Sequence, residues 1–147
     1  MAEKKRHTVL VNGPISPAFI ADSIAKHSSK TNIGGHAIFM GQVRADIKDG
    51  KTVAAIEYTA YNEMAEDIFY QIREAAFARH ELVCMHIYHS LGTVNAGEIG
   101  LYVFVSSVHR APAFDACREI VEEIKKKAPV WGRELFADNS HNWKVNT

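Results

Sequence analysis

The sequence predicts an α+β fold, in which strands and helices come in blocks rather than in strict alternation. After a first short helix, two strand-like segments precede a long helical segment, and two more precede a second one. Apolar residues that recur with period two mark the strands, and apolar residues at helical spacing mark the helices. The chain has 147 residues, 47% of them hydrophobic, which is enough for a real core, so one domain over residues 1–147 is expected.

The helices of the first half carry clear signals. Ser16 and Pro17 are typical of an N-cap followed by proline at the first helical position, which predicts a helix over about residues 17–27. From residue 62 to about residue 80, apolar positions recur at helical spacing, with charged residues on the other face. We expect a long helix there.

Two β-rich segments lie between these helices, at residues 36–44 and 52–61. Asp49-Gly50 between them is a turn signal of the kind that joins hairpin strands. The two segments are therefore predicted to pair with each other across a loop of irregular length.

The second half repeats the pattern. Residues 83–88 and 99–106 alternate in the manner of two antiparallel strands. A second long helix begins near Pro112 and ends in the lysine run 125–127, which a proline follows. Residues 130–136 are expected to form a short strand before an aromatic tail.

Charge and hydropathy exclude several classes of protein. Lys and Arg together number 17, as do Asp and Glu, so the formal net charge is zero. No long-range field therefore favours nucleic acid or an anionic membrane. Near the N-terminus only residues 9–11 form an apolar stretch, too short for a signal peptide, and no apolar run approaches the roughly 20 residues of a membrane span. We expect a cytoplasmic protein.

Neither metal nor organic cofactor is expected. His86 and His89 are three residues apart on a strand, which puts them on opposite faces, and no His, Cys or carboxylate cluster has convincing ligand spacing. The glycines form no phosphate-binding loop. Cys84 and Cys117 share no CxxC spacing and are interpreted as reduced, buried residues. A persulfide on either cysteine, which would make the chain a sulfur relay, is the alternative.

Three groups of cations could bind an anion or take part in catalysis. His109 and Arg110 lie directly before a helix, where unpaired N–H groups and the helix dipole favour phosphate. Arg44 follows a strand and could offer its fork of donors to a phosphate or carboxylate. Lys125–Lys127 stabilise a helix end, but a lysine desolvated beside other cations would also have a lowered pKa, which suits it to proton transfer or to attack on an acyl group. A solvated loop or surface residue is the alternative interpretation of each arginine.

Five segments, in unbroken order from about Gly34 to Trp143, resemble the large subunit of molybdopterin synthase, the MoaE family. They are Phe39-Met40-Gly41-Gln42-Val43-Arg44; Ile56-Glu57-Tyr58 with Tyr61 and Met64-Ala65-Glu66; Ser106-Ser107-Val108-His109-Arg110 with Ala113-Phe114; Lys125 to Trp131; and Trp143. Each segment alone would be unremarkable, and their order makes the resemblance specific.

The resemblance implies an α/β-hammerhead fold with additional antiparallel strands. It also implies a central homodimer with a small ubiquitin-like subunit at each outer end, the Gly-Gly tail of which enters the active site, so the assembly would be a heterotetramer. The implied activity is sulfur transfer from the thiocarboxylate of that tail to cyclic pyranopterin monophosphate. Two transfers would give the dithiolene of molybdopterin, in molybdenum cofactor biosynthesis.

The resemblance also assigns site residues. It places the catalytic lysine at Lys125 and the substrate-binding residues at Phe39, Arg44, His109 and Arg110. The His-Arg pair would come from the other subunit of the homodimer.

The chain departs from the family's pattern at two places. Gly132 stands where the family commonly has a second lysine, and His89–Gly92 lacks an arginine common there. Arg133, Lys126 or Lys127 could replace the missing cation, and a bulge at Gly132 would turn Arg133 inward. The alternative is a catalytically weakened member that acts mainly as a binding partner of the small subunit.

Overall fold

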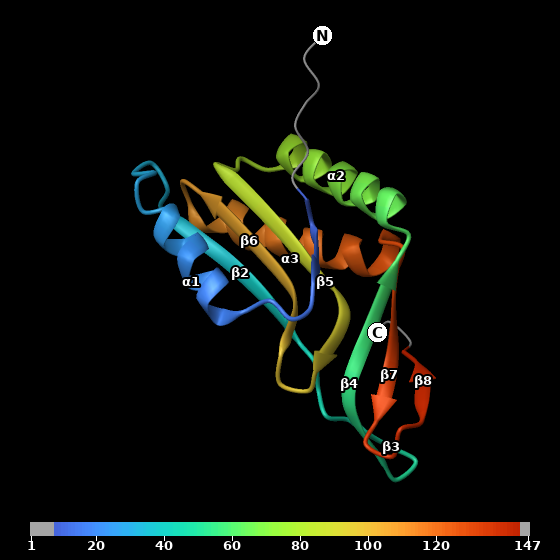
Figure 1. Ribbon diagram of the computed structural model, residues 1–147. Coiled ribbons are helices and arrows are strands. Elements are labelled where there is room, and N and C mark those ends of the chain that lie inside the picture. The colour runs from blue at the N-terminus through green and yellow to red at the C-terminus, as the bar shows by residue number, and fades with distance from the viewer. Residues whose placement is uncertain (1–7, 145–147) are drawn as a thin grey trace.

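Three helices and an eight-stranded sheet make up residues 8–144, the part of the chain that the computed structural model describes (Figure 1). The predicted α+β fold is confirmed. The elements are β1 (Leu10–Asn12), α1 (Pro17–Lys26), β2 (Gly35–Gln42), β3 (Ile47–Lys48), β4 (Lys51–Ala60), α2 (Asn62–Arg79), β5 (Cys84–Asn95), β6 (Ile99–Ser107), α3 (Arg110–Lys127), β7 (Val130–Phe136) and β8 (His141–Trp143).

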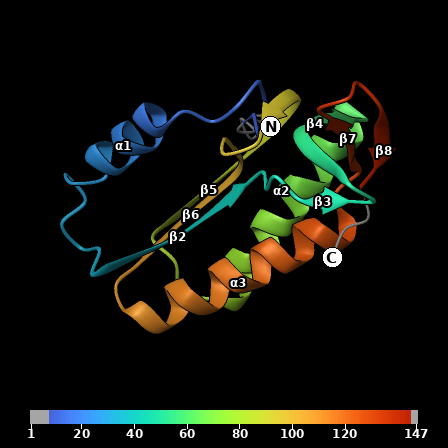
Figure 2. The same ribbon diagram turned by 90° about the horizontal axis from the view of Figure 1, so that it is seen from below.

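The sheet separates α1 from α2 and α3, which lie on its opposite face (Figure 2). Strand β6 contributes side chains to the hydrophobic core on both faces of the sheet. Its residues Val103 and Val105 belong to the main core cluster that α2 and α3 cover, and Tyr102 and Phe104 pack with Ile20 of α1 on the other face. Since β6 is buried on both faces, it needs a hydrogen-bonded neighbour on each side, and β5 and β2 supply them.

The predicted pairing of segments 36–44 and 52–61 is wrong. β2 pairs with β6, whereas β4 lies between β5 and β7. The turn signal at Asp49 and Gly50 does form a hairpin, with φ angles of 51° and 75°, but the strand that it joins to β4 is only the two-residue β3. The position of the turn was predicted correctly, but the strand that it joins to β4 was not.

Strand β5 passes from one part of the sheet to the other. It pairs with β6 over Cys84–His89 and with β4 over Gly92–Asn95. Gly92 has φ +80° at this transition, a conformation that favours glycine. The change of partner brings β4, β7 and β8 beside the end of α3, and the candidate site forms there (Figure 1).

The helices follow their sequence signals closely. Ser16 caps α1 by accepting a hydrogen bond from the Phe19 N–H at 3.1 Å, with Pro17 at the first position. Helix α3 begins at Arg110, slightly before the expected Pro112, and ends before Pro129. None of the described helices is both long and apolar enough to span a membrane.

Candidate active site

A small pocket lies at the C-terminal end of α3, where β4, β5 and β7 meet. Strands supply its apolar and aromatic wall, and two lysines supply its charge. The lining residues are Tyr58, His89, Ile124, Lys125, Ala128, Val130, Gly132 and Lys144.

Lys125 projects into this pocket from the last turn of α3. Desolvation lowers the pKa of its ammonium below the ordinary value of 10.5, and the positive charge of Lys144 lowers it further. The group is therefore easier to deprotonate than a surface lysine. Such a lysine is suited to proton transfer and to stabilising charge that develops on a nearby oxygen.

Lys144 is a functional candidate that no sequence pattern indicated. Strand β8 pairs with β7, and directly after it the backbone N–H of Lys144 donates to the Gly132 carbonyl oxygen at 2.9 Å. This bond holds Lys144 against the position where the family's second lysine was expected. Because Lys144 is distant from Gly132 along the chain and β8 was not predicted, no sequence signal linked the two.

Gly132 packs tightly against Ile56 and the ring of Tyr58. A Cβ at Gly132 would lie 2.9 Å from Ile56 Cγ2 and 3.3 Å from Tyr58 Cε1, and one at Gly100 would lie 3.3 Å from Tyr58 Cε2. The two glycines leave room for the ring between them. Burial raises the pKa of Tyr58, so its phenol stays protonated and can donate a hydrogen bond at neutral pH.

His89 forms the buried wall of the pocket. Its Nδ1 lies 2.8 Å from the Ser90 carbonyl oxygen, which can only accept, so Nδ1 carries the proton. Its ring meets the Tyr58 ring edge to face, with centroids 5.1 Å apart. Burial lowers the pKa of His89 to about 4, against the effect of its bond to Ser90, and the charge of Lys125 lowers it further. His89 is therefore neutral at physiological pH and does not compete with the lysines for an anion.

Replacement of Gly132 by alanine is expected to lower the free energy of unfolding by about 1–3 kcal/mol, the usual cost of overpacking. The new methyl group would lie 2.9 Å from Ile56 Cγ2. Gly35→Ala is the control, because its Cβ would come no closer than 3.8 Å to a neighbour. Chemical denaturation of both variants measures the effect. Wild-type stability of Gly132→Ala would contradict the tight packing.

The structure does not support the prediction that Arg133, Lys126 or Lys127 replaces the missing lysine. The expected bulge at Gly132 is wrong, because β7 stays in register with β4 there. Arg133 consequently faces the other side and donates to Glu57 Oε1 at 2.6 Å. Lys127 pairs with Glu123 at 2.6 Å, and Lys126 is exposed. None of these three lines the pocket as the described residues form it.

His109 and Arg110 lie at the opposite end of α3 from Lys125. His109 is the N-cap, Arg110 is the first helical residue, and both are exposed. With a rise of 1.5 Å per residue, roughly 22 Å of helix separates Arg110 from Lys125. The two groups cannot meet in one pocket within a single chain.

Phe39 and Arg44 lie along β2 and just beyond it. Phe39 is 36% exposed, which is unusual for a phenylalanine in a sheet. The Arg44 guanidinium is 3.3 Å from the Asp46 carboxylate and largely open to solvent. Val43, beside Arg44, belongs to a buried cluster against which Tyr58 packs. Arg44 therefore lies next to a cluster that reaches the Lys125 pocket.

Both cysteines are free and buried, as expected. Cys117 belongs to the main core under α3. Burial raises the pKa of its thiol, which disfavours the thiolate that a sulfur relay needs. This finding weighs against the persulfide alternative at Cys117.

Comparison with known sequences gives consistent matches. Residues 11–127 match the family model described as "MoaE protein". A molybdopterin synthase catalytic subunit from Aspergillus niger is 36% identical over 140 residues, which are 95% of this chain and 75% of that protein. One from Pyrococcus abyssi is 42% identical over 124 residues, 84% of this chain and 82% of that protein.

Comparison with solved structures gives matches to the same group of proteins. A crystal structure of molybdopterin synthase from Staphylococcus aureus has a TM-score of 0.83 at 27% identity and covers 97% of this chain and 99% of its own. A complex of subunits 1 and 2 of molybdopterin-converting factor from Helicobacter pylori has a TM-score of 0.77 over 92% of this chain and 88% of its own. Its identity of 20% supports the fold alone.

Proposed function

The chain belongs to the MoaE protein family, and from this premise we propose that it transfers sulfur from the C-terminal thiocarboxylate of a small ubiquitin-like subunit to cyclic pyranopterin monophosphate. Its relatives are catalytic subunits of molybdopterin synthase, so it is an enzyme of molybdenum cofactor biosynthesis. We place the reaction in the cytoplasm, where thiols stay reduced, because both cysteines of the chain are free. The observation that carries the proposal is the pocket in which Lys125 and Lys144 lie together.

The charge of this pocket suits the two reactants. A thiocarboxylate and a pterin phosphate are both anions, and their repulsion opposes reaction unless cations lie between them. Lys125 and Lys144 supply two positive charges, while His89 stays neutral. In each transfer, sulfur replaces one oxygen on the pterin. The carbon–sulfur bond of the thiocarboxylate breaks and a carbon–oxygen bond forms at the same carbon, which leaves the small subunit with an ordinary carboxylate. Lys125 would stabilise the negative charge that develops on the acyl oxygen.

We further propose that a second copy of the chain completes the site. His109 and Arg110 are suited to bind phosphate at the N-terminus of α3, but they lie far from Lys125 of the same chain. In a two-fold homodimer, the pair from one subunit can lie beside the lysines of the other. Phe39 and Arg44 would line the approach of the extended Gly-Gly tail.

Replacement of Lys144 by alanine is expected to raise the pKa of Lys125, because a neighbouring positive charge is lost. If transfer needs protonated Lys125, activity falls as pH rises through its pKa, so the variant should lose activity at a higher pH than wild type. Its plateau rate should fall about tenfold, or about 1.4 kcal/mol of transition-state stabilisation. Single-turnover rates against pH measure both effects. Lys126→Ala is the control. If Lys144→Ala lost activity at the same alkaline pH as wild type, the charge of Lys144 would not affect the pKa of Lys125.

The proposed function is tested by incubating the chain with a thiocarboxylated small subunit and the pterin precursor, and by measuring the dithiolene product. The control is the same small subunit with an ordinary carboxylate, which should give none. The second candidate, a weakened member that only binds the small subunit, predicts a stable complex without turnover. Lys144 favours the active enzyme, because it puts a second cation beside Gly132.

A further inference from the structure

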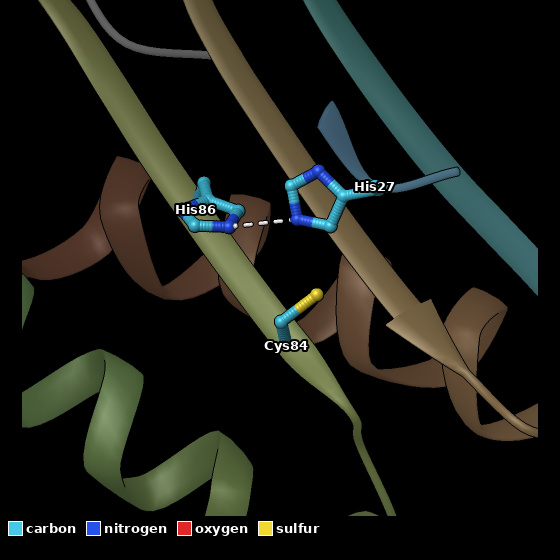
Figure 3. A group of neighbouring side chains, drawn as sticks. All are labelled: His27, Cys84 and His86. Carbon is cyan, nitrogen blue, oxygen red and sulfur yellow. Dashed lines mark hydrogen bonds between the residues drawn. The ribbon is translucent and has the colours of Figure 1, made fainter. Parts of the chain in front are cut away.

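Three metal-binding side chains converge on the sheet face beneath α1 (Figure 3). Cys84 and His86 are two residues apart on β5, so they point to the same face, and His27 follows directly after α1. Their candidate ligand atoms all lie within 4.8 Å of one another. His27 and Cys84 are buried, and His86 is partly buried.

The hydrogen bonding of His27 directs a lone pair into the cluster. Its Nδ1 lies 2.6 Å from the Ser23 carbonyl oxygen, which can only accept, so this nitrogen carries the proton. Its Nε2 then presents a lone pair to His86 Nε2, 3.1 Å away. A ring N–H donated to a backbone carbonyl is the usual outer support of a metal-binding histidine.

The geometry resembles a pair of ligands on one ion. Two nitrogens bound tetrahedrally to Zn²⁺ at 2.0–2.1 Å would lie about 3.3 Å apart. The two Nε2 atoms are close to that separation, and Figure 3 shows the Cys84 sulfur pointing toward the rings. The three ligand atoms, which lie within 4.8 Å of one another, would have to draw in until sulfur and nitrogen are roughly 3.6 Å apart, their separation on one zinc ion.

We propose that His27, Cys84 and His86 bind a divalent transition metal, with Zn²⁺ as the ion that the donor set favours. One thiolate and two imidazoles suit zinc, and a set without carboxylates does not suit Mg²⁺ or Ca²⁺. Three protein ligands leave a fourth position for water. This proposal departs from the sequence expectation of no metal, which considered spacing along the chain and paired His86 with His89 rather than with His27.

The site would fasten α1 to the sheet rather than take part in sulfur transfer. Within α1 the buried hydrophobic contact comes from Ile20, and Ser23 Oγ lies 2.7 Å from the Tyr102 hydroxyl. The metal would add a link between the end of α1 and β5. His86 and His89 face opposite sides of β5, so the cluster is separated from the Lys125 pocket by the sheet.

The test is titration of chelator-treated protein with Co²⁺, followed by absorption. One equivalent of Co²⁺ should give a thiolate charge-transfer band in the near ultraviolet and the visible bands of a tetrahedral ion, and Zn²⁺ should abolish both. Cys84→Ser should remove the charge-transfer band. His27→Gln and His86→Gln should weaken binding at least tenfold.

Two matched variants serve as controls. Cys117→Ser removes the other buried cysteine, and His141→Gln removes an exposed histidine of β8, so both should bind Co²⁺ as wild type does. Wild-type protein without a thiolate band would overturn the proposal and leave His27 and His86 as a simple hydrogen-bonded pair. A band that persists in Cys84→Ser would overturn it as well. Because the wild-type result alone can refute the site, the test does not depend on how the variants fold.

Discussion

Replacement of Lys125 by alanine is expected to slow single-turnover sulfur transfer by at least about a hundredfold, which corresponds to about 2.7 kcal/mol of transition-state stabilisation. Lys125 is the lysine of α3 that lines the pocket, and its lowered pKa marks a partly desolvated ammonium. A group that stabilises charge only in the transition state affects the rate more than it affects binding. The affinity for the small subunit should therefore change by less than about threefold.

Lys126→Ala is the matched control for this experiment. Lys126 is the next residue of the same helical turn and is exposed like Lys125, but it does not line the pocket. Its removal should change the rate by less than about twofold. Equal rates for Lys125→Ala and Lys126→Ala would remove Lys125 from the reaction.

Replacement of Arg110 by alanine is expected to weaken binding of the pterin precursor by roughly 10- to 150-fold, since a lost charge-assisted contact costs about 1.5–3 kcal/mol. Arg110 is exposed at the first position of α3, where a positive charge does not stabilise the helix. The free energy of unfolding should therefore change by no more than about 0.5 kcal/mol. Calorimetry with the precursor and chemical denaturation measure the two effects.

Arg118→Ala is the control for Arg110, because it removes an exposed arginine from the same helix. It should leave precursor affinity unchanged. Unaltered affinity in Arg110→Ala would mean that this helix N-terminus does not bind the phosphate. Equal losses in both variants would indicate a general effect of charge rather than a contact.

Local patterns predicted the helices and the β5–β6 pair because their signals are short in range. Proline and serine mark the start of α1, and the turn at residues 95–97 joins strands that follow one another. The partner of β2 was not predictable in this way, because β6 is distant in sequence. β6 is buried on both faces of the sheet, and β2 pairs with one of its edges. Strand β1 was also missed. Glu66 of α2 accepts hydrogen bonds from the N–H groups of Val9 and Leu10 and so holds the chain at the start of β1.

The site was predictable only in part, for the same reason. Lys125 was identified by resemblance, and its place beside other cations gave an independent reason to expect a lowered pKa. Lys144 and His27 were not identified from the sequence. The residues with which each of them would form a site are distant along the chain. Gly132 was noticed as a departure, but its close packing against Ile56 and Tyr58 depends on the pairing of β4 with β7.

The central claim, sulfur transfer in a pocket completed by a second copy of the chain, is tested most directly with a mixed dimer. A Lys125→Ala subunit and an Arg110→Ala subunit with different tags are combined, and the heterodimer is isolated. The assay uses a precursor concentration that saturates wild type but not the Arg110→Ala variant, so that both parents are nearly inactive. If Arg110 acts across the interface, one of the two sites in the heterodimer keeps both residues, and activity should recover to about half of wild type. A heterodimer no more active than the parent homodimers would contradict the account.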